Sequence, residues 1–427
     1  MSKAPRPKYR KGKPPKRGGH RDQAGSAPVA NASIQKRAKP EPSQVVDLTP
    51  LAPIIVRSGR PFDSQAGVDP ARLPPPSTLA GCLRSAWARQ TGQAYGSALS
   101  RLDIAGPLLV REAPGRQPPT VLVPKPADAL YFGTGSSAQL LRAVPCAPAA
   151  GEGTDLPGGL ALVSLNDPDA GREKPGKWPT WWSLADLLAF RREESVTHQQ
   201  VEANGWSPPA GELRTHVAIA ARTGAAETGK LFQTSGLDLG PTKCARDEPG
   251  MRLLARCAEP LAEALVHLGG ERRLAALGPA PAAHWPEPPA DWSRDILAAG
   301  GLTLTLVSPA LFAGGYLPGW LSRQLTGSPP GQQGLRLQLL AVACERWEPH
   351  SGWDLATQRP RRGRRLVPAG ATLWFRLAEC PDPAALDALW LGSLCDDPQD
   401  RCDGFGLALP APWKPTISTR PIAQSRT

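Results

Sequence analysis

Short apolar runs separated by proline and glycine make up most of the pattern along this chain. The first run, Leu48–Arg57, ends in β-branched residues and predicts a strand, and its prolines suit the edge of a sheet. A helix is expected next, with Ser77 as its N-cap. Residues at helical spacing define its core side, Leu79, Cys82, Leu83, Ala86 and Gln90, and its opposite side, Ser77, Gly81, Arg84 and Ala88.

Eight further segments have the length and composition of strands. They are Leu108–Arg111, Thr120–Val123, Leu160–Ser164, Leu213–Ala220, Leu302–Val307, Leu335–Ala343, Thr372–Leu377 and Gly406–Leu409. Short helices are predicted after Ser183 and at Pro383–Leu391. A strand followed by a helix is the start of a βαββαβ unit. We therefore expect an α+β fold of two ferredoxin-like units that carry long insertions.

The predicted organisation has four parts. Residues 1–46 form a disordered basic arm, because they contain almost no large apolar side chains with which to join a core. Residues 47–295 form the first ferredoxin-like unit with its insertions, and 296–413 form the second unit with a Gly-rich loop. Residues 414–427 are a C-terminal tail.

The formal charge of +12 comes almost entirely from the arm. Residues 1–40 carry twelve Lys or Arg and one acid, Asp22, which leaves 38 basic and 37 acidic residues for the rest. A nucleic-acid site on the body must therefore come from local clusters of charge. The arm itself has two interpretations, a solubilising tail or a sequence-independent contact to RNA phosphates.

Neither a membrane segment nor a signal peptide is indicated, because no apolar stretch is long enough to span a bilayer and the basic start is not followed by a short apolar core. We expect a cytoplasmic protein. The eight cysteines include no Cys-x-x-Cys pair, so no zinc site, disulfide framework or cofactor is predicted.

Three stretches are more specific. The first is Leu51–Phe62, which contains RSGRPF, followed by PPPSTLAGCLR at Pro74–Arg84. The second consists of Arg214–Val217 and Thr223–Phe232. The third runs through Phe312–Trp320, Ser351–Asp354, Val367–Gly370 and Gly404–Gly406. In this order and spread, they resemble the Cmr subunit three family of type III-B CRISPR complexes, which belongs to the RAMP superfamily.

The resemblance covers the body and implies its role. It implies a pair of RRM-like ferredoxin folds without nuclease activity that bind the five-prime, repeat-derived tag of the guide RNA (crRNA). The implied protein partners are the large polymerase-like Cmr subunit and the backbone RAMP subunits of the same complex, with no membrane partner. The basic arm is a departure from the family pattern.

The same residues make physical sense as RNA contacts. A helix that starts at Ser77 and Thr78 favours a phosphate at its N-terminus, Gly81 lets a backbone approach, and Arg84 can pair with a second phosphate. Arg57 and Arg60 on the preceding turn add to this cluster. The alternative is that these arginines are ordinary solvated side chains.

Further candidates lie in glycine-containing segments. Thr223–Lys230 is expected to form a hairpin or thumb with Lys230 beside single-stranded RNA, or else an ordinary loop. Gly314, Gly315 and Tyr316 combine close backbone approach with a ring on which a base can stack, whereas Trp320 is assigned to the core. Main-chain N–H groups at Gly404, Phe405 and Gly406 are expected to face RNA. The densest charge on the body is a cluster of five arginines, Arg359, Arg361, Arg362, Arg364 and Arg365. This cluster is expected either to contact phosphates or a partner, or to be a solvated run.

The main rival is a metal-independent RAMP ribonuclease that uses a histidine as general base. His216, in a predicted strand, has the best position among the six histidines, but a lone strand histidine is more often structural. Metal-dependent cleavage would need the acids Asp396, Asp397, Asp400 and Asp403, which fit a loop better. The sequence contains neither a cyclase signature nor a P-loop. A tag-binding subunit of a type III-A or III-D complex is the closest alternative within the scaffold class.

Overall fold

The chain divides into two units, Met1–Lys39 and Pro40–Thr427. The computed structural model describes residues 42–57, 69–113, 117–133, 135, 138–165, 175–176, 178–240, 250–354 and 359–419, which all belong to the second unit. Most of the predicted arm, Arg60 and the C-terminal residues 420–427 lie outside the described part.

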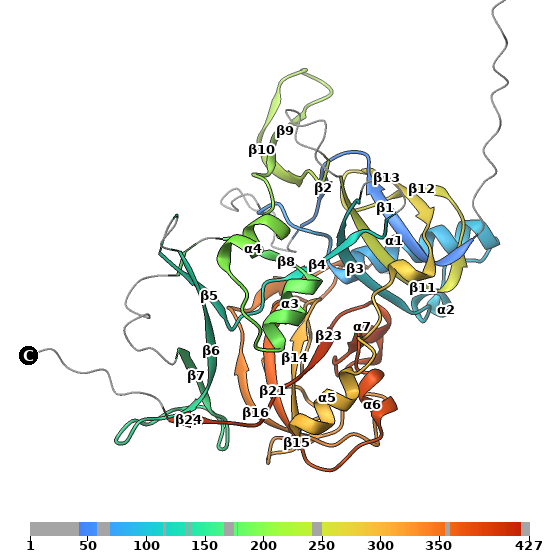
Figure 1. Ribbon diagram of the computed structural model, residues 1–427. Coiled ribbons are helices and arrows are strands. Elements are labelled where there is room, and N and C mark those ends of the chain that lie inside the picture. Colours follow the sequence, from blue (N-terminus) through green and yellow to red (C-terminus); the bar gives the residue numbers. More distant parts are fainter. Residues whose placement is uncertain are drawn as a thin grey trace, which may run out of the picture. The chain divides into compact units, whose positions relative to one another are not determined.

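The N-terminal half is built on a seven-stranded antiparallel sheet in the order β12-β13-β1-β11-β3-β4-β8. Its strands are β1 Ser43–Pro50, β3 Ile104–Arg111, β4 Thr120–Pro124, β8 Trp181–Ser183, β11 Met251–Leu261, β12 Ala264–His267 and β13 Leu274–Pro279. Helix α1, Pro76–Thr91, lies on one face of this sheet, followed by the single turn α2, Ser97–Ser100 (Figure 1).

The C-terminal half is built on a six-stranded antiparallel sheet in the order β15-β16-β21-β14-β23-β22. Its strands are β14 Gly301–Leu306, β15 Thr326–Gly327, β16 Leu337–Ala343, β21 Thr372–Leu377, β22 Gly392–Ser393 and β23 Leu407–Pro412. Three helices accompany it, α5 Trp292–Ala299, α6 Pro383–Asp387 and α7 Pro398–Cys402. Helices α5 and α6 lie together beside β23 (Figure 1).

The insertions form smaller elements around the two sheets. Beside the second sheet lie β5 Ala129–Phe132, β6 Gln139–Ala147, β7 Leu162–Leu165 and β24 Ser418–Thr419 (Figure 1). A three-stranded sheet contains β2 Ile54–Ile55, β9 Glu212–Ile219 and β10 Ala226–Leu237. Two ribbons pair β17 Glu348–His350 with β20 Arg364–Leu366, and β18 Trp353–Asp354 with β19 Arg359–Pro360. The remaining helices are α3 Leu184–Arg191, α4 His198–Asn204 and the 3₁₀ turn η3 Ala282–His284.

The α+β class and all eight later strand predictions are confirmed, since each predicted segment overlaps an observed strand. The first strand differs. The predicted segment is divided between two strands: β1 starts at Ser43, inside the predicted arm, and lies between β13 and β11 in the middle of the first sheet, whereas Ile54–Ile55 form β2 at the edge of the three-stranded sheet. The prediction of an edge strand is therefore wrong for Leu48–Pro50 and confirmed for Ile54–Ile55. Pro50 is tolerated because it is the last residue of β1, where a missing N–H removes little pairing.

The first sheet is buried on both faces, which explains why its strands are almost continuously apolar. On β3 and β11, successive residues face opposite cores. Leu109 and Leu253 join the cluster under α1, whereas Leu108 and Leu254 join the larger cluster that includes the second sheet. This larger cluster makes the two halves one continuous structure. In the described part of the chain, no helix is long and apolar enough to cross a membrane.

A buried ion pair joins the insertions to the second sheet. Arg191, at the end of α3, donates two hydrogen bonds to Asp128, at 2.6 and 2.9 Å, and others to the hydroxyls of Thr305 and Thr372. Burial alone would raise the pKa of Asp128, but the charge of Arg191 and hydrogen bonds from Arg191 and Thr372 hold it below its usual value. The ion pair therefore anchors α3 and the segment around Asp128 to the second sheet, and it is buried rather than exposed at the surface.

Replacing Arg191 by Met should therefore lower the free energy of unfolding by about 3–5 kcal/mol, because the Asp128 carboxylate would stay buried without its partner. Urea denaturation measures this loss. The matched control is Arg294→Met, which removes an exposed pair with Asp291 and should cost no more than about 1 kcal/mol. Equal losses in the two variants would show that the Asp128 pair is not an anchor.

Candidate nucleic-acid interface

Helix α1 begins two residues before the start that an N-cap at Ser77 predicts. Its N-cap is Pro75 and its first residue is Pro76, whose fixed φ and missing N–H suit that position. The assignment of Ser77 as the N-cap is therefore wrong. The Oγ atom of Ser77 lies 3.4 Å from the Nε2 atom of His350, so the start of α1 lies against the β17–β20 ribbon.

The predicted outer side of α1 is only partly exposed. Gly81 is exposed, as predicted, and no neighbour lies within 4 Å of where its Cβ would be. Arg84 and Ala88 are buried, however, and Gln90, assigned to the core side, is exposed, so the prediction for these three residues is wrong. Arg84 and Ala88 are buried because the helix packs against the sheet on one side and against α7, from the other half of the chain, on the other.

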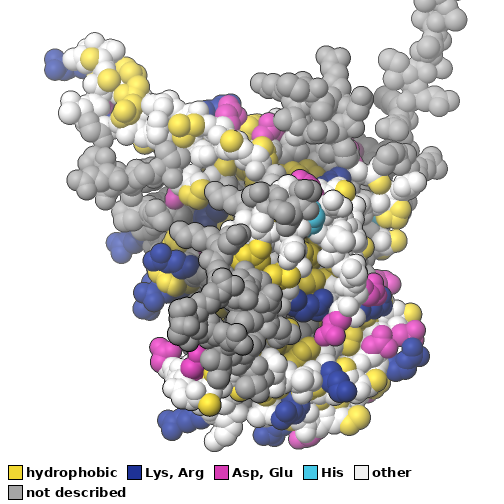
Figure 2. Space-filling view, turned by 60° about the vertical axis from the view of Figure 1, so that its left-hand side comes forward, with side chains coloured by type: hydrophobic (Ala, Val, Ile, Leu, Met, Phe, Trp, Pro, Cys, Tyr) yellow, Lys and Arg dark blue, Asp and Glu magenta, His cyan; other side chains and the backbone are white. Residues whose placement is uncertain are grey.

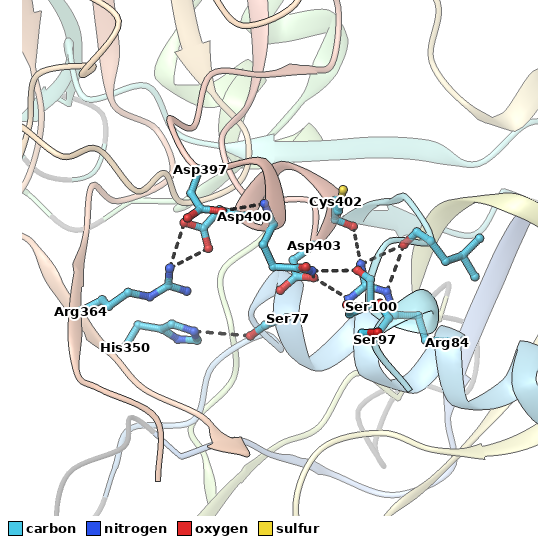
Figure 3. A network of polar contacts seen from close by, with 12 residues as sticks. Ser77, Arg84, Ser97, Ser100, His350, Arg364, Asp397, Asp400, Cys402 and Asp403 are labelled. Carbon is cyan, nitrogen blue, oxygen red and sulfur yellow. Dashed lines mark hydrogen bonds and ion pairs between the residues drawn. The ribbon is translucent and has the colours of Figure 1, made fainter. Parts of the chain in front are cut away.

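Arg84 connects the two halves of the chain. Its guanidinium donates to Oδ1 of Asp403 at 2.5 Å and to the carbonyl oxygens of Leu102 and Cys402 (Figure 3). Both charged side chains are almost fully buried. With its donors directed at protein oxygens, Arg84 has a structural role here instead of the predicted phosphate contact.

The loop Gly404–Gly406 is also buried, with Phe405 at 0% exposure. The N–H groups of these residues donate to the carbonyls of Arg401, Asp400 and Pro309, in that order. The prediction that they face RNA is wrong, since every main-chain donor of the loop is already used.

The small residues of this loop are explained by packing. Gly404 has a φ of 88°, and a Cβ there would lie 2.8 Å from the carbonyl oxygen of Gly106 and 2.9 Å from that of Ile104. Gly406 has a φ of 71°, and a Cβ there would lie 2.7 Å from Sγ of Cys395. Glycine is required because the second half of the chain meets β3 of the first half at this point.

Beside this contact lies a polar cavity of about 300 Å³, here called the arginine cavity. Its walls are the start of α1, the β17–β20 ribbon and α7 with its flanking residues, which contribute Asp397, Asp400 and Asp403. Arg361 and Arg362 contribute exposed side chains. Arg364 differs from its neighbours, because it points inward and donates to both oxygens of Asp400 at 2.7 and 2.9 Å (Figure 3).

His350 is buried between this cavity and a second one. Burial, together with the positive charges of Arg364, Arg72 and Arg361, lowers the pKa of His350 to about 4. At neutral pH its ring is therefore uncharged. The second cavity, also of about 300 Å³, has walls formed largely by prolines and is here called the proline cavity.

Arg72 links the proline cavity to the β9–β10 hairpin. It lines the cavity and donates to the main-chain carbonyl of Arg57 at 3.0 Å. The guanidinium of Arg57 lies 5.9 Å from the ring centroid of Phe232, and Phe232 stacks on His216 with centroids 4.9 Å apart. Basic and aromatic groups thus follow one another from the hairpin to the arginine cavity.

Residues Thr223–Lys230 lie in the β9–β10 hairpin, which fits both the predicted thumb and the ordinary hairpin loop. The hairpin projects away from the sheets, and hydrophobic side chains gather on it (Figures 1 and 2). Strand register places Phe232 and His216 on one face. The other face carries four exposed aliphatic side chains, Leu213, Val217, Ile219 and Leu231, with exposures of 56, 42, 57 and 66%. Lys230 is exposed and pairs with Glu227.

Gly314, Gly315 and Tyr316 lie elsewhere, in the loop between β14 and β15. Asp396 fixes this loop by accepting hydrogen bonds from the N–H groups of Ala313 and Gly319. Gly314 and Gly315 are exposed, whereas Tyr316 is half-buried against the larger core. These three residues line neither the arginine cavity nor the proline cavity. Trp320 stacks on Phe375 of the core, as predicted.

The four neighbouring aspartates each have a structural partner. Asp396 holds the loop just described, Asp397 caps α7, and Asp400 and Asp403 pair with arginines. Among the described residues, no three His, Cys, Asp or Glu side chains are placed to hold a metal ion.

Comparison with known families identifies the chain. The family model described as CRISPR-associated protein (Cas_Cmr3) matches residues 46–413. The chain belongs to this family. No curated protein matches it.

Solved structures similar to this Cmr subunit three family member are chains of a type III-B Cmr-beta complex studied by cryo-EM. One, from the complex bound to cognate target RNA, has 14% identity and a TM-score of 0.44, over 77% of this chain and 86% of that chain. Another, from the complex with target RNA and AMPPnP, has 14% identity and a TM-score of 0.42, over 80% and 87%. TM-scores this low add nothing to the family assignment.

The sequence predicts some of the residues that line the candidate interface of this family member, but not others. Arg57, Ser77 and the hairpin lie along it, and Thr78 and Gly81 are on the same end of α1. Arg72 and His350 also line the cavities of the candidate interface, and the sequence did not predict them there. Arg72 stands two residues before the Pro74–Arg84 stretch, and this proximity is a signal in the sequence that could have indicated it. His350 reaches α1 only through tertiary packing.

The structural role of Arg84 makes a direct prediction. Arg84→Met should destabilise the fold by about 3–5 kcal/mol, because Asp403 would remain buried without its cation. Arg89→Met, on the same helix at an exposed position, is the control and should leave the unfolding midpoint nearly unchanged. If the Arg84→Met protein is as stable as the unmodified chain and has lost only RNA affinity, the result would instead support a contact between Arg84 and a phosphate.

Proposed function

We propose that this chain is the subunit of a type III-B CRISPR ribonucleoprotein that binds the five-prime, repeat-derived tag of the guide RNA. On this proposal it also docks to the large polymerase-like subunit and to the backbone RAMP subunits of the same complex. The family assignment supports membership in this system. The RNA role is supported by residues of this chain.

The observation that carries the proposal is the line of groups between the hairpin and the arginine cavity. Cations at Arg57, Arg361 and Arg362 suit phosphates, and the ring of Phe232 suits a base. Because the body is nearly neutral, such a local cluster is what an RNA site on it requires.

The strand order supports the RRM-like architecture that this role implies. In the first sheet the central strands are β13-β1-β11-β3, and in the second they are β23-β14-β21-β16. Both orders are fourth, first, third, second along the chain, the order of a ferredoxin-like βαββαβ unit. Each unit has helices at only one of the two helix positions of the βαββαβ pattern. In the first unit α1 follows the first strand, and in the second α6 and α7 precede the last strand. We propose that both halves are ferredoxin-like units.

We further propose that the chain does not cleave RNA. His216, the best candidate base, stacks on Phe232 and lies 3.0 Å from the Oγ1 atom of Thr234, so it is part of a packed surface. His350 is buried beside arginines. If the purified chain cleaves repeat RNA and the His216→Ala variant does not, the ribonuclease alternative replaces this proposal. Of the scaffold alternatives, the family match favours type III-B over type III-A or III-D.

Binding to tagged guide RNA tests the proposal. RNA recovered with the chain from its host should share one common five-prime start, and a synthetic copy should bind more tightly than the same RNA without that start. Replacing Arg361 or Arg362 by Ala should weaken binding and reduce the slope of log affinity against log salt by about 0.7 each, because one phosphate contact is lost.

Arg294→Ala is the matched control, since Arg294 is exposed on α5 and lines neither cavity. It should change neither affinity nor slope. Unchanged slopes in folded Arg361 and Arg362 variants would remove the arginine cavity from the RNA path, and equal affinity for tagged and untagged RNA would refute tag binding itself.

A further inference from the structure

The proline cavity is a second feature of this surface with a distinct chemistry. Rings form much of its wall, with Pro74, Pro76, Pro107, Pro124 and Trp181 contributed by the first half of the chain. The second half contributes Val307, Pro368 and Ala369. The cavity therefore exists only where the two halves meet.

Its size and walls suit a flat ligand. A volume of about 300 Å³ lies at the lower end of the range for small-molecule sites, enough for one nucleobase and too small for an extended chain. Proline rings and an indole offer planar apolar faces, on which bases of any identity stack.

Polar groups around the cavity supply both donors and acceptors. Nε of Arg72 is buried and has no protein acceptor, while its Nη2 is held by the carbonyl of Arg57. Lys125 is held in place by hydrogen bonds to the carbonyls of Pro126 and Ala129. Glu348, which is exposed, adds a carboxylate acceptor. Every nucleobase edge carries at least one donor and one acceptor, which these groups complement.

The cavity also lies beside the groups that are proposed to contact the RNA strand. Through the carbonyl of Arg57 it adjoins the Phe232 stack, and it shares His350 with the arginine cavity. A single strand whose phosphates lie along the arginines therefore passes its mouth.

We propose that the proline cavity captures one nucleobase of the guide tag, turned out of the strand and stacked between the proline and tryptophan rings. This inference rests on the tag binding proposed above and adds a contact to one nucleobase. The phosphate contacts hold the backbone of the tag, whereas this cavity holds one of its bases.

The experiment measures the affinity of the full chain for synthetic guide RNA in which one tag nucleotide at a time lacks its base. One position should lose about 10-fold or more in affinity, the expected cost of losing a stacked base. Ala369→Phe fills the cavity from its wall. It should lower affinity for intact RNA to the level of that abasic RNA, abolish the penalty at that position and leave the salt slope unchanged.

Ala384→Phe, at an exposed position on α6, is the matched control and should keep the full abasic penalty. If Ala369→Phe does not fold, Ala369→Leu and Glu348→Ala make the same test with smaller changes. Tag-dependent binding with no sensitive position, or an undiminished penalty in folded cavity variants, overturns the inference while tag binding stands. Loss of binding to the large subunit with unchanged RNA affinity assigns the cavity to a partner protein and also overturns it.

Discussion

The two sheets meet where Gly404 lies against the main chain of Ile104 and Gly106, at a separation that admits no side chain. Beside this contact, the buried pair of Arg84 and Asp403 holds α1 against the short helix α7. Backbone close approach fixes distance and the ion pair fixes orientation, so the halves have little freedom to slide. The rest of the surface chemistry depends on this junction.

One consequence is the placement of α1 beside the β17–β20 ribbon. His350 reaches Ser77 across that boundary, and Arg364 is held by Asp400 of α7. Arg364 is occupied by this pair, and Arg361 and Arg362, in the loop before β20, line the cavity. Residues from both halves of the chain thus line each cavity. The RNA role proposed for the chain therefore requires both halves packed together.

Local sequence determined much of this structure. The later strands were predictable because apolar, β-branched runs between glycines and prolines have few other solutions, as at Thr372–Leu377. The failures share one cause. Arg84, Phe405 and the first strand were assigned by periodicity or motif, but long-range packing covers the side of α1, the Gly-rich loop and both edges of β1. Nothing near His350 in the sequence indicates its approach to Ser77, 273 residues earlier.

The most direct test of the RNA path is photocrosslinking of the full chain to guide RNA carrying 4-thiouridine at successive tag positions, with the crosslinked residues identified by mass spectrometry. The account predicts crosslinks on the β9–β10 hairpin near Phe232, around the proline cavity near Trp181, and on the ribbon near Arg361. Crosslinks confined to the loop around Tyr316, or to α5 and α6, would contradict it.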